Sequence, residues 1–74
     1  MTLKELGEKL NKMYNNAPTG DLVAMIHLFG IKYANEISIS QFSKKDIAIA
    51  ARIPKSYGTE ISKGVNLAKY VKEK

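Results

Sequence analysis

The chain has 74 residues, a formal net charge of +5 and no cysteine. This length suits one domain, and the lack of cysteine excludes disulfides, thiolate metal ligands and cysteine nucleophiles. No signal peptide is recognisable after Met1, and the most apolar stretch is residues 22–31, much shorter than the about 20 residues of a membrane span. We therefore expect a single cytoplasmic domain over residues 1–74.

The first predicted helix spans residues 3–15. Thr2 and Glu5 have the spacing of a capping box, in which each side chain bonds a free backbone N–H of the other residue. Residues 15–18 end the helix. Its apolar residues recur at helical spacing, which predicts an amphipathic helix lying on a core. They are Leu3, Leu6, Leu10, Met13 and Tyr14.

A second helix is predicted over residues 21–35, capped by Thr19 or Asp21. Its apolar residues cover most of its circumference: they are Leu22, Val23, Met25, Ile26, Leu28, Phe29, Ile31 and Tyr33. Such a helix either lies at the centre of the core or is covered by another chain. We expect it to leave an apolar patch for a partner protein or a homodimer. Gly30 favours close packing of another helix.

Residues 37–42 alternate apolar and polar side chains up to Phe42. The alternation permits a short extended segment, but a lone strand would have no sheet to join. We therefore expect a connector whose apolar side chains hold it to the core.

Two more helices are predicted in the second half. The third spans residues 44–51, with Ser43 as its cap and Asp46 three residues later. It ends before Pro54, which restricts the residue that precedes it. The fourth spans residues 56–72, and its inner stripe is Tyr57, Ile61, Gly64, Val65, Ala68 and Val71. The fold class predicted from these patterns is all-α: a small four-helix domain with no stable sheet.

The small and apolar residues of the last two helices carry the most specific pattern. Ala48 and Ala51 are small enough for two helices that cross steeply through a short turn. Ile47, Ile53 and Ile61 have the spacing to fill the wedge beneath that crossing. On these residues, the segment 43–68 resembles the helix-turn-helix superfamily of DNA-binding domains.

Two positions depart from the family pattern. Arg52 stands where the family usually has the glycine of the turn, so it must adopt the backbone angle that the turn imposes. Gly58 replaces an apolar residue three positions before Ile61. A glycine inside a helix costs stability, and here it indicates a close backbone approach.

The resemblance implies that the second helix of the pair enters the major groove of duplex DNA. The exposed reading face would consist of Lys55, Ser56, Thr59, Glu60 and Lys63. Phosphate contacts would come from Lys44, Lys45, Arg52 and Lys69. Tyr57 either touches the DNA backbone or packs against Ile61.

The distribution of charge agrees with this implication. Residues 1–36 carry four basic and four acidic side chains, whereas residues 37–74 carry the whole excess of +5. We expect a neutral helical support in residues 1–36 and a basic helix-turn-helix in residues 43–72. The function implied is duplex DNA binding by a small regulator or accessory domain. The same fold also serves as a protein-interaction module without nucleic acid, and that alternative stays open.

The sequence has few side chains that could act in catalysis or bind a metal. His27 is the only histidine, and its apolar helix favours a partly buried side chain with a bonded ring nitrogen. Zinc needs three or four ligands, which the sequence does not group together. The serines have no paired base. We therefore expect no enzymatic activity, no metal, no cofactor and no small-molecule substrate.

Overall fold

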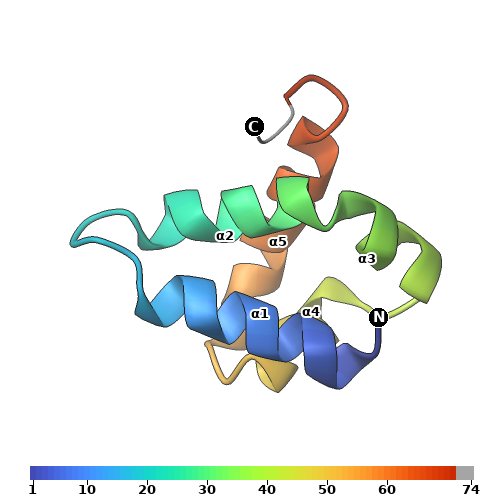
Figure 1. Cartoon of the computed structure of the whole chain (residues 1–74), viewed down its shortest axis with the longest axis horizontal. Coiled ribbons are helices and arrows are strands. Elements are labelled where there is room, and N and C mark those ends of the chain that lie inside the picture. Colours follow the sequence, from blue (N-terminus) through green and yellow to red (C-terminus); the bar gives the residue numbers. More distant parts are fainter. Residues whose placement is uncertain (72–74) are drawn as a thin grey trace.

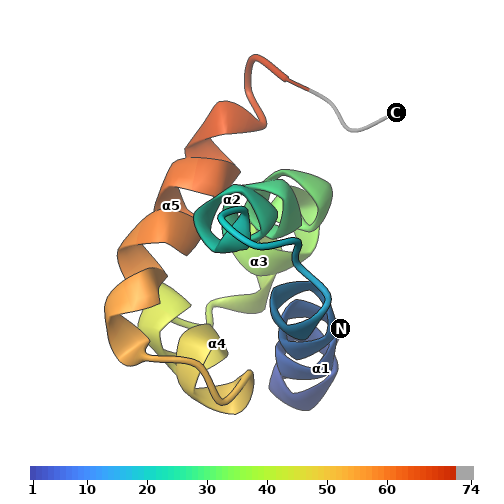
Figure 2. The ribbon, with the colours of Figure 1, turned by 90° about the vertical axis from the view of Figure 1, so that its left-hand side faces the viewer.

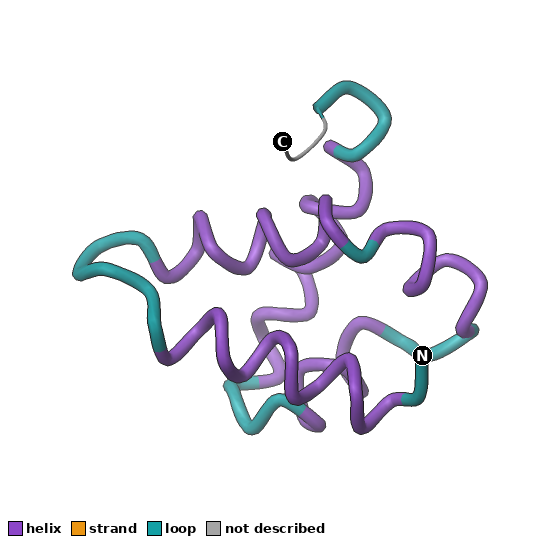
Figure 3. The backbone as a smooth tube through the Cα atoms, viewed as in Figure 1, coloured by secondary structure: helices purple, strands orange, loops and turns teal. Residues whose placement is uncertain are grey.

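The computed structural model describes residues 1–71 and contains only helices and loops over that range (Figures 1, 2 and 3). The elements are α1 (Leu3–Asn15), α2 (Leu22–Lys32), α3 (Ala34–Ser40), α4 (Lys44–Ala50), the 3-10 turn η1 (Lys55–Tyr57) and α5 (Gly58–Leu67). The predicted all-α fold class is confirmed, with one helix more than the four expected. None of the helices described is long and apolar enough to cross a membrane.

Local capping fixes the starts of α1 and α4 as predicted. The Thr2 side chain accepts a hydrogen bond from the Glu5 N–H at 3.1 Å, and the Glu5 carboxylate accepts one from the Thr2 N–H at 2.8 Å. At α4, the Ser43 hydroxyl accepts from the Asp46 N–H at 3.0 Å. Each bond satisfies a donor that the first helical turn would otherwise leave free.

The segment after α2 differs from its prediction. The helix expected over residues 21–35 ends at Lys32, because the backbone at Tyr33 leaves the helical region with φ −107° and ψ 21°. Residues expected to form an extended connector form α3 instead. Residues two apart in a helix point about 200° apart, so Ile37 is buried at 2% exposure while Ile39 is 79% exposed. The alternating pattern therefore fits one short helix equally well.

The helices form two groups around one core. Figure 2 shows α1, α2 and α3 on one side and α4 and α5 on the other. The buried apolar residues between them come from every α-helix and from the turn after α4. They are Leu6, Leu10, Ile26, Phe29, Ile37, Ile47, Ala48, Ala51, Ile53 and Ile61. The core of this small domain is thus shared by both halves of the chain.

The most extensive contact joins α2 to α5, which crosses behind it in Figure 1. Gly30 and Gly64 meet at this crossing. A Cβ on Gly30 would lie 2.8 Å from the Gly64 Cα, and one on Gly64 would run into the His27 carbonyl oxygen. Close packing at Gly30 was expected, and it makes α2 the central helix of the domain.

The apolar residues of α2 are covered to different extents within the domain. Ile26 and Phe29 are fully buried, and most of the other apolar side chains of α2 are half-buried. Of its large apolar side chains, Leu22 and Val23 stay exposed, at 37% and 41%. Because α5 and α1 both pack on α2, the domain itself covers part of its most apolar helix, and whether the rest meets a partner stays a prediction.

Candidate nucleic-acid interface

The candidate interface is the corner formed by α4, the turn after it and α5. Ala48 and Ala51 are completely buried at this corner, as their small size predicted. The Ile53 N–H donates a hydrogen bond to the Ala48 carbonyl at 3.2 Å, which closes the turn back on α4. Pro54 then starts the new direction of the chain, and the Tyr57 N–H donates to its carbonyl at 3.0 Å.

Arg52 occupies the left-handed backbone region, with φ 60°. The sequence predicted that this residue must adopt the angle usually supplied by glycine, and the structure confirms it. A side chain in this region costs about 1–2 kcal/mol. The neighbours Ala51 and Ile53 are buried in the core, and their packing offsets this cost. The Arg52 side chain itself is exposed.

Gly58 brings the starts of the two helices together. A Cβ at this position would lie 3.1 Å from the Lys45 amide nitrogen and 3.3 Å from the Lys44 carbonyl carbon. The first turn of α5 therefore lies directly on the first turn of α4. The close approach predicted at Gly58 thus places the starts of α4 and α5 side by side.

The predicted fourth helix differs at both ends. It begins with the single 3-10 turn η1 and then continues as α5, which ends at Leu67. Lys69 therefore lies beyond the last residue of α5, and Figure 1 shows that this end of α5 is the one remote from α4. Val71, predicted on the inner stripe, is 49% exposed because the helix has already ended. The predicted end at residue 72 lies outside the described residues.

The residues predicted to face DNA divide into two groups by exposure. Seven are exposed to solvent: Lys45, Arg52, Lys55, Ser56, Thr59, Lys63 and Lys69. Three are half-buried: Lys44, Tyr57 and Glu60. The corner gathers all of them except Lys69, and two of the half-buried residues have partners inside the domain.

Tyr57 packs inward. Its ring lies 5.9 Å from that of Tyr14, centroid to centroid, with the planes tilted by 58°. Burial raises the pKa of the Tyr14 hydroxyl, and the neighbouring Tyr57 raises it further. This contact ties η1 to α1 through Tyr14, a partner other than the Ile61 considered from the sequence.

Glu60 bonds to the core helix. His27 Nε2 and Glu60 Oε1 lie 2.7 Å apart, and Lys63 Nζ is 3.5 Å from the other carboxylate oxygen. The hydrogen bond from His27 lowers the pKa of Glu60 below its ordinary 4.5, against the opposing effect of burial. The bonded ring nitrogen expected of His27 is confirmed. Its partner was missed, because nothing local links residues so far apart in the chain.

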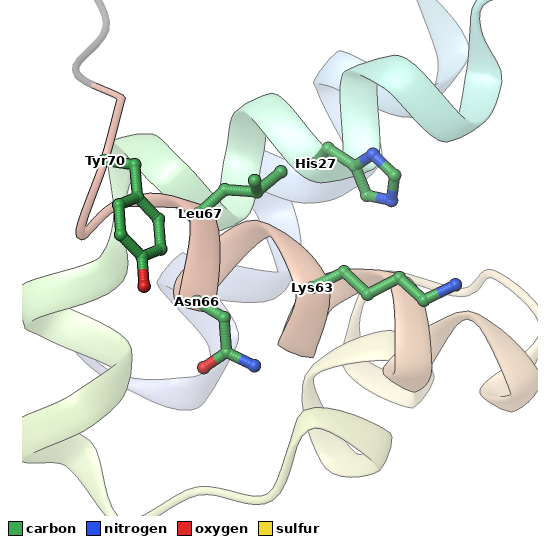
Figure 4. A pocket seen from close by; sticks show the side chains of 5 residues that line it. All are labelled: His27, Lys63, Asn66, Leu67 and Tyr70. Atoms are coloured by element: carbon green, nitrogen blue, oxygen red, sulfur yellow. The ribbon is translucent and has the colours of Figure 1, made fainter.

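A shallow apolar hollow lies beside this pair, between α2 and α5 (Figure 4). It measures about 330 Å³ and is lined by His27, Lys63, Asn66, Leu67 and Tyr70. Leu67 is 39% exposed and Tyr70 is 84% exposed. Within residues 1–71, no three histidine or acidic side chains gather as a metal site would require.

A comparison with protein families gives a match over both halves of the chain. A family model described as an HTH-like domain matches residues 2–74. No curated protein and no solved structure matches the chain. The match includes the neutral first half as well as the corner, so α1 and α2 are part of the family's fold. The chain belongs to the family of HTH-like domains.

Proposed function

We propose that this domain binds duplex DNA, with η1 and the first turns of α5 placed in the major groove. The observation that carries the proposal is the contact at Gly58, which sets the starts of α4 and α5 side by side. In helix-turn-helix proteins the second helix reads base edges from its N-terminal residues, while the first helix lies across the backbone. The exposed Lys55, Ser56 and Thr59 stand at that position on α5 and its preceding turn.

Charge supports the same face. Residues 44–69 contain six basic and two acidic side chains. One of the two acidic groups, Glu60, is bonded to His27 and Lys63. We assign Lys45 and Arg52 to the phosphates that flank the groove, since exposed cations beside helix starts suit such contacts. Lys63 lies further along α5 and extends the same basic strip.

The test is a titration of a fluorescently labelled, mixed-sequence duplex at two or more salt concentrations. Each phosphate contact contributes about −0.9 to the slope of log affinity against log salt. We expect Lys55→Ala and Lys63→Ala each to weaken binding and to reduce that slope by about 1. Lys4→Ala on α1 is the control, because it removes the same charge from another helix. Equal losses in all three variants, or no binding at low salt, would contradict a docked α5.

The alternative function is a protein-interaction module without nucleic acid. The hollow beside Leu67 and Tyr70 favours it, because exposed apolar side chains are typical of protein contacts. A homodimer through α2 finds less support, since of its large apolar side chains Leu22 and Val23 are the ones that remain exposed. The salt titration separates the two functions. A lack of affinity for duplex DNA at low salt would favour the protein-interaction module. A role as a regulator or as an accessory domain is compatible with either outcome.

A further inference from the structure

The exposed side chains of η1 and the first turns of α5 are of two chemical kinds. Over residues 55–63, the exposed side chains are those of Lys55, Ser56, Thr59 and Lys63. Two of them end in an ammonium group on a flexible stem, and two in a short hydroxyl. The remaining residues of the segment are buried or half-buried. These four side chains are therefore the ones that this segment offers to a duplex.

Discrimination between bases requires side chains that pair with one base edge in a fixed geometry. Arginine pairs in this way with guanine, asparagine and glutamine pair with adenine, and an acidic side chain accepts from cytosine. Serine and threonine hydroxyls bond to more than one kind of base. Lysine can reach guanine, but its ammonium is a point charge that also binds phosphates. The exposed set thus favours contact with a duplex over choice among sequences.

Glu60, the acidic side chain of residues 55–63, is held inside the domain. Its Oε1 lies 2.7 Å from His27 Nε2, and its Oε2 lies 3.5 Å from Lys63 Nζ. The Glu60 side chain is only 22% exposed. A carboxylate with both oxygens engaged must give up these bonds before it can accept from a cytosine amino group. The bond to His27 therefore opposes the reading of cytosine that Glu60 could otherwise provide.

The other side chains of the corner that could pair with a base edge lie away from the start of α5. Arg52 belongs to the turn that precedes η1, and Asp46 to the first turn of α4. Asn66 lies in the last turn of α5, where it lines the hollow shown in Figure 4. Base edges are contacted by the N-terminal residues of the second helix, whereas the first helix crosses the backbone. None of these three residues thus occupies a reading position.

We propose that the α4–α5 corner binds duplex DNA with little discrimination between sequences. Such binding rests on the proposed function and defines its ligand as duplex DNA in general, with no preferred operator. Lys55 and Lys63 bind phosphates, and Ser56 and Thr59 bond to whichever base edge or phosphate they meet. Binding of this kind is chiefly electrostatic, so its affinity falls with salt to the same extent for every sequence.

The experiment measures the affinity of the full chain for a panel of duplexes of equal length, by competition with one labelled duplex. The panel contains A·T-rich, G·C-rich and mixed sequences, and a randomised pool is taken through rounds of selection. We expect the affinities to agree within about fivefold, which is no more than one mismatched base pair costs a sequence-specific protein. We also expect one common salt slope and no motif enriched from the pool.

A pair of variants at Thr59 tests whether this uniformity comes from the side chains at the reading positions. Thr59→Arg places a guanine-pairing side chain at an exposed position of α5, and should create a preference of more than about fivefold for duplexes with a suitable guanine. Thr59→Lys is the matched control, because it adds the same charge without the planar fork of arginine. It should tighten binding to all duplexes alike.

Two results would overturn the inference. The pool could yield a motif that the parent chain binds more than about fivefold better than the rest of the panel. Thr59→Arg could also bind every duplex equally, which would show that residue 59 does not face the bases. Both results leave duplex binding itself standing. A lack of binding to any duplex at low salt is a separate outcome, because it contradicts the proposed function and with it the inference.

Discussion

His27 on α2 and Glu60 on α5 are joined by a hydrogen bond of 2.7 Å across 33 residues of chain. The bond draws the acidic group of α5 toward the core helix, beside the exposed basic residues of the corner. It therefore affects two measurable properties, the dependence of stability on pH and the net charge of the α4–α5 corner.

The first prediction concerns pH. The folded-state pKa of Glu60 lies below its ordinary 4.5, chiefly because of the His27 hydrogen bond. The ionised carboxylate therefore contributes stability above about pH 4.5, and this contribution is lost as the pH falls through the lowered folded-state pKa. We expect Glu60→Gln to reduce the free energy of unfolding at neutral pH. Below about pH 4.5, the free energy of unfolding should fall less steeply with pH in this variant than in the parent. Urea unfolding at a series of pH values measures this, with Glu8→Gln on α1 as the control. Equal pH curves for the Glu60→Gln variant and the parent would contradict the role assigned to the pair.

The second prediction concerns the same substitution and DNA. When the Glu60 carboxylate bonds only within the domain, its replacement by glutamine removes one negative charge of the protein that would repel the DNA phosphates. Duplex affinity should then rise, and the gain should shrink as salt screens the charges. Anisotropy titrations at two salt concentrations provide the measurement. A loss of affinity for particular sequences would show instead that Glu60 contacts a base, the role considered from sequence.

The third prediction tests the backbone contact between α2 and α5. Gly64→Ala places a methyl group against the His27 carbonyl oxygen and the Gly30 backbone. Overpacking of this kind costs about 1–3 kcal/mol, more than alanine gains in helix propensity. We expect the free energy of unfolding to fall by about 1–2 kcal/mol, which lowers Tm by roughly 5–15 °C in a domain of this size. Asn66→Ala, at an exposed position of the same helix, should change Tm little. A tolerated Gly64→Ala would mean that the helices can separate without loss.

The fourth prediction separates the two roles of Arg52. Glycine accepts φ 60° without steric cost, so Arg52→Gly should keep the stability of the parent or raise it by up to about 1 kcal/mol. Arg52→Val should lower stability by about 1–3 kcal/mol, because β-branched residues resist that backbone region. Both variants lose the charge and should weaken duplex binding. Thermal unfolding and DNA titration together test this; a destabilised Arg52→Gly would show that the side chain itself supports the turn.

The fifth prediction concerns oligomeric state. A stable interface usually buries about 800 Å² per partner, which would be about a sixth of the total accessible surface of 4884 Å². Leu22 and Val23 are too small a patch for this. We expect sedimentation equilibrium to give the monomer mass of 8.2 kDa into the high micromolar range. A dimer that dissociates when Val23 is replaced by glutamate would instead support the hypothesis of a homodimer through α2.

Interactions between near neighbours in the chain were predictable from sequence. The caps at Thr2 and Ser43 are formed by residues three apart, so their spacing alone identifies them. The corner at Ala48 and Ala51 was also predictable, because a steep crossing demands small residues at fixed positions. In both cases the sequence pattern and the physical requirement concern the same few positions.

Long-range relationships were not predictable in the same way. The hydrogen bond between His27 and Glu60 depends on how α2 crosses α5, which no local pattern encodes. Gly7 is a partial exception, because a glycine inside an amphipathic helix can indicate that another helix crosses closely. A Cβ on Gly7 would lie 2.7 Å from the Ala50 carbonyl carbon, so α1 and α4 do approach closely there. The nature of α3 was missed because alternation over so few residues fits both a strand and a helix.

The glycine contact between α2 and α5 also has a consequence for how such domains diversify. At Gly30 and Gly64 the helix is held by backbone packed on backbone, so its position does not depend on the identity of its outward side chains. Exposed positions such as Thr59 and Lys63 can therefore change without moving the helix. The domain is in this respect a fixed frame with an exchangeable surface, suited to the selection of variants that recognise new targets.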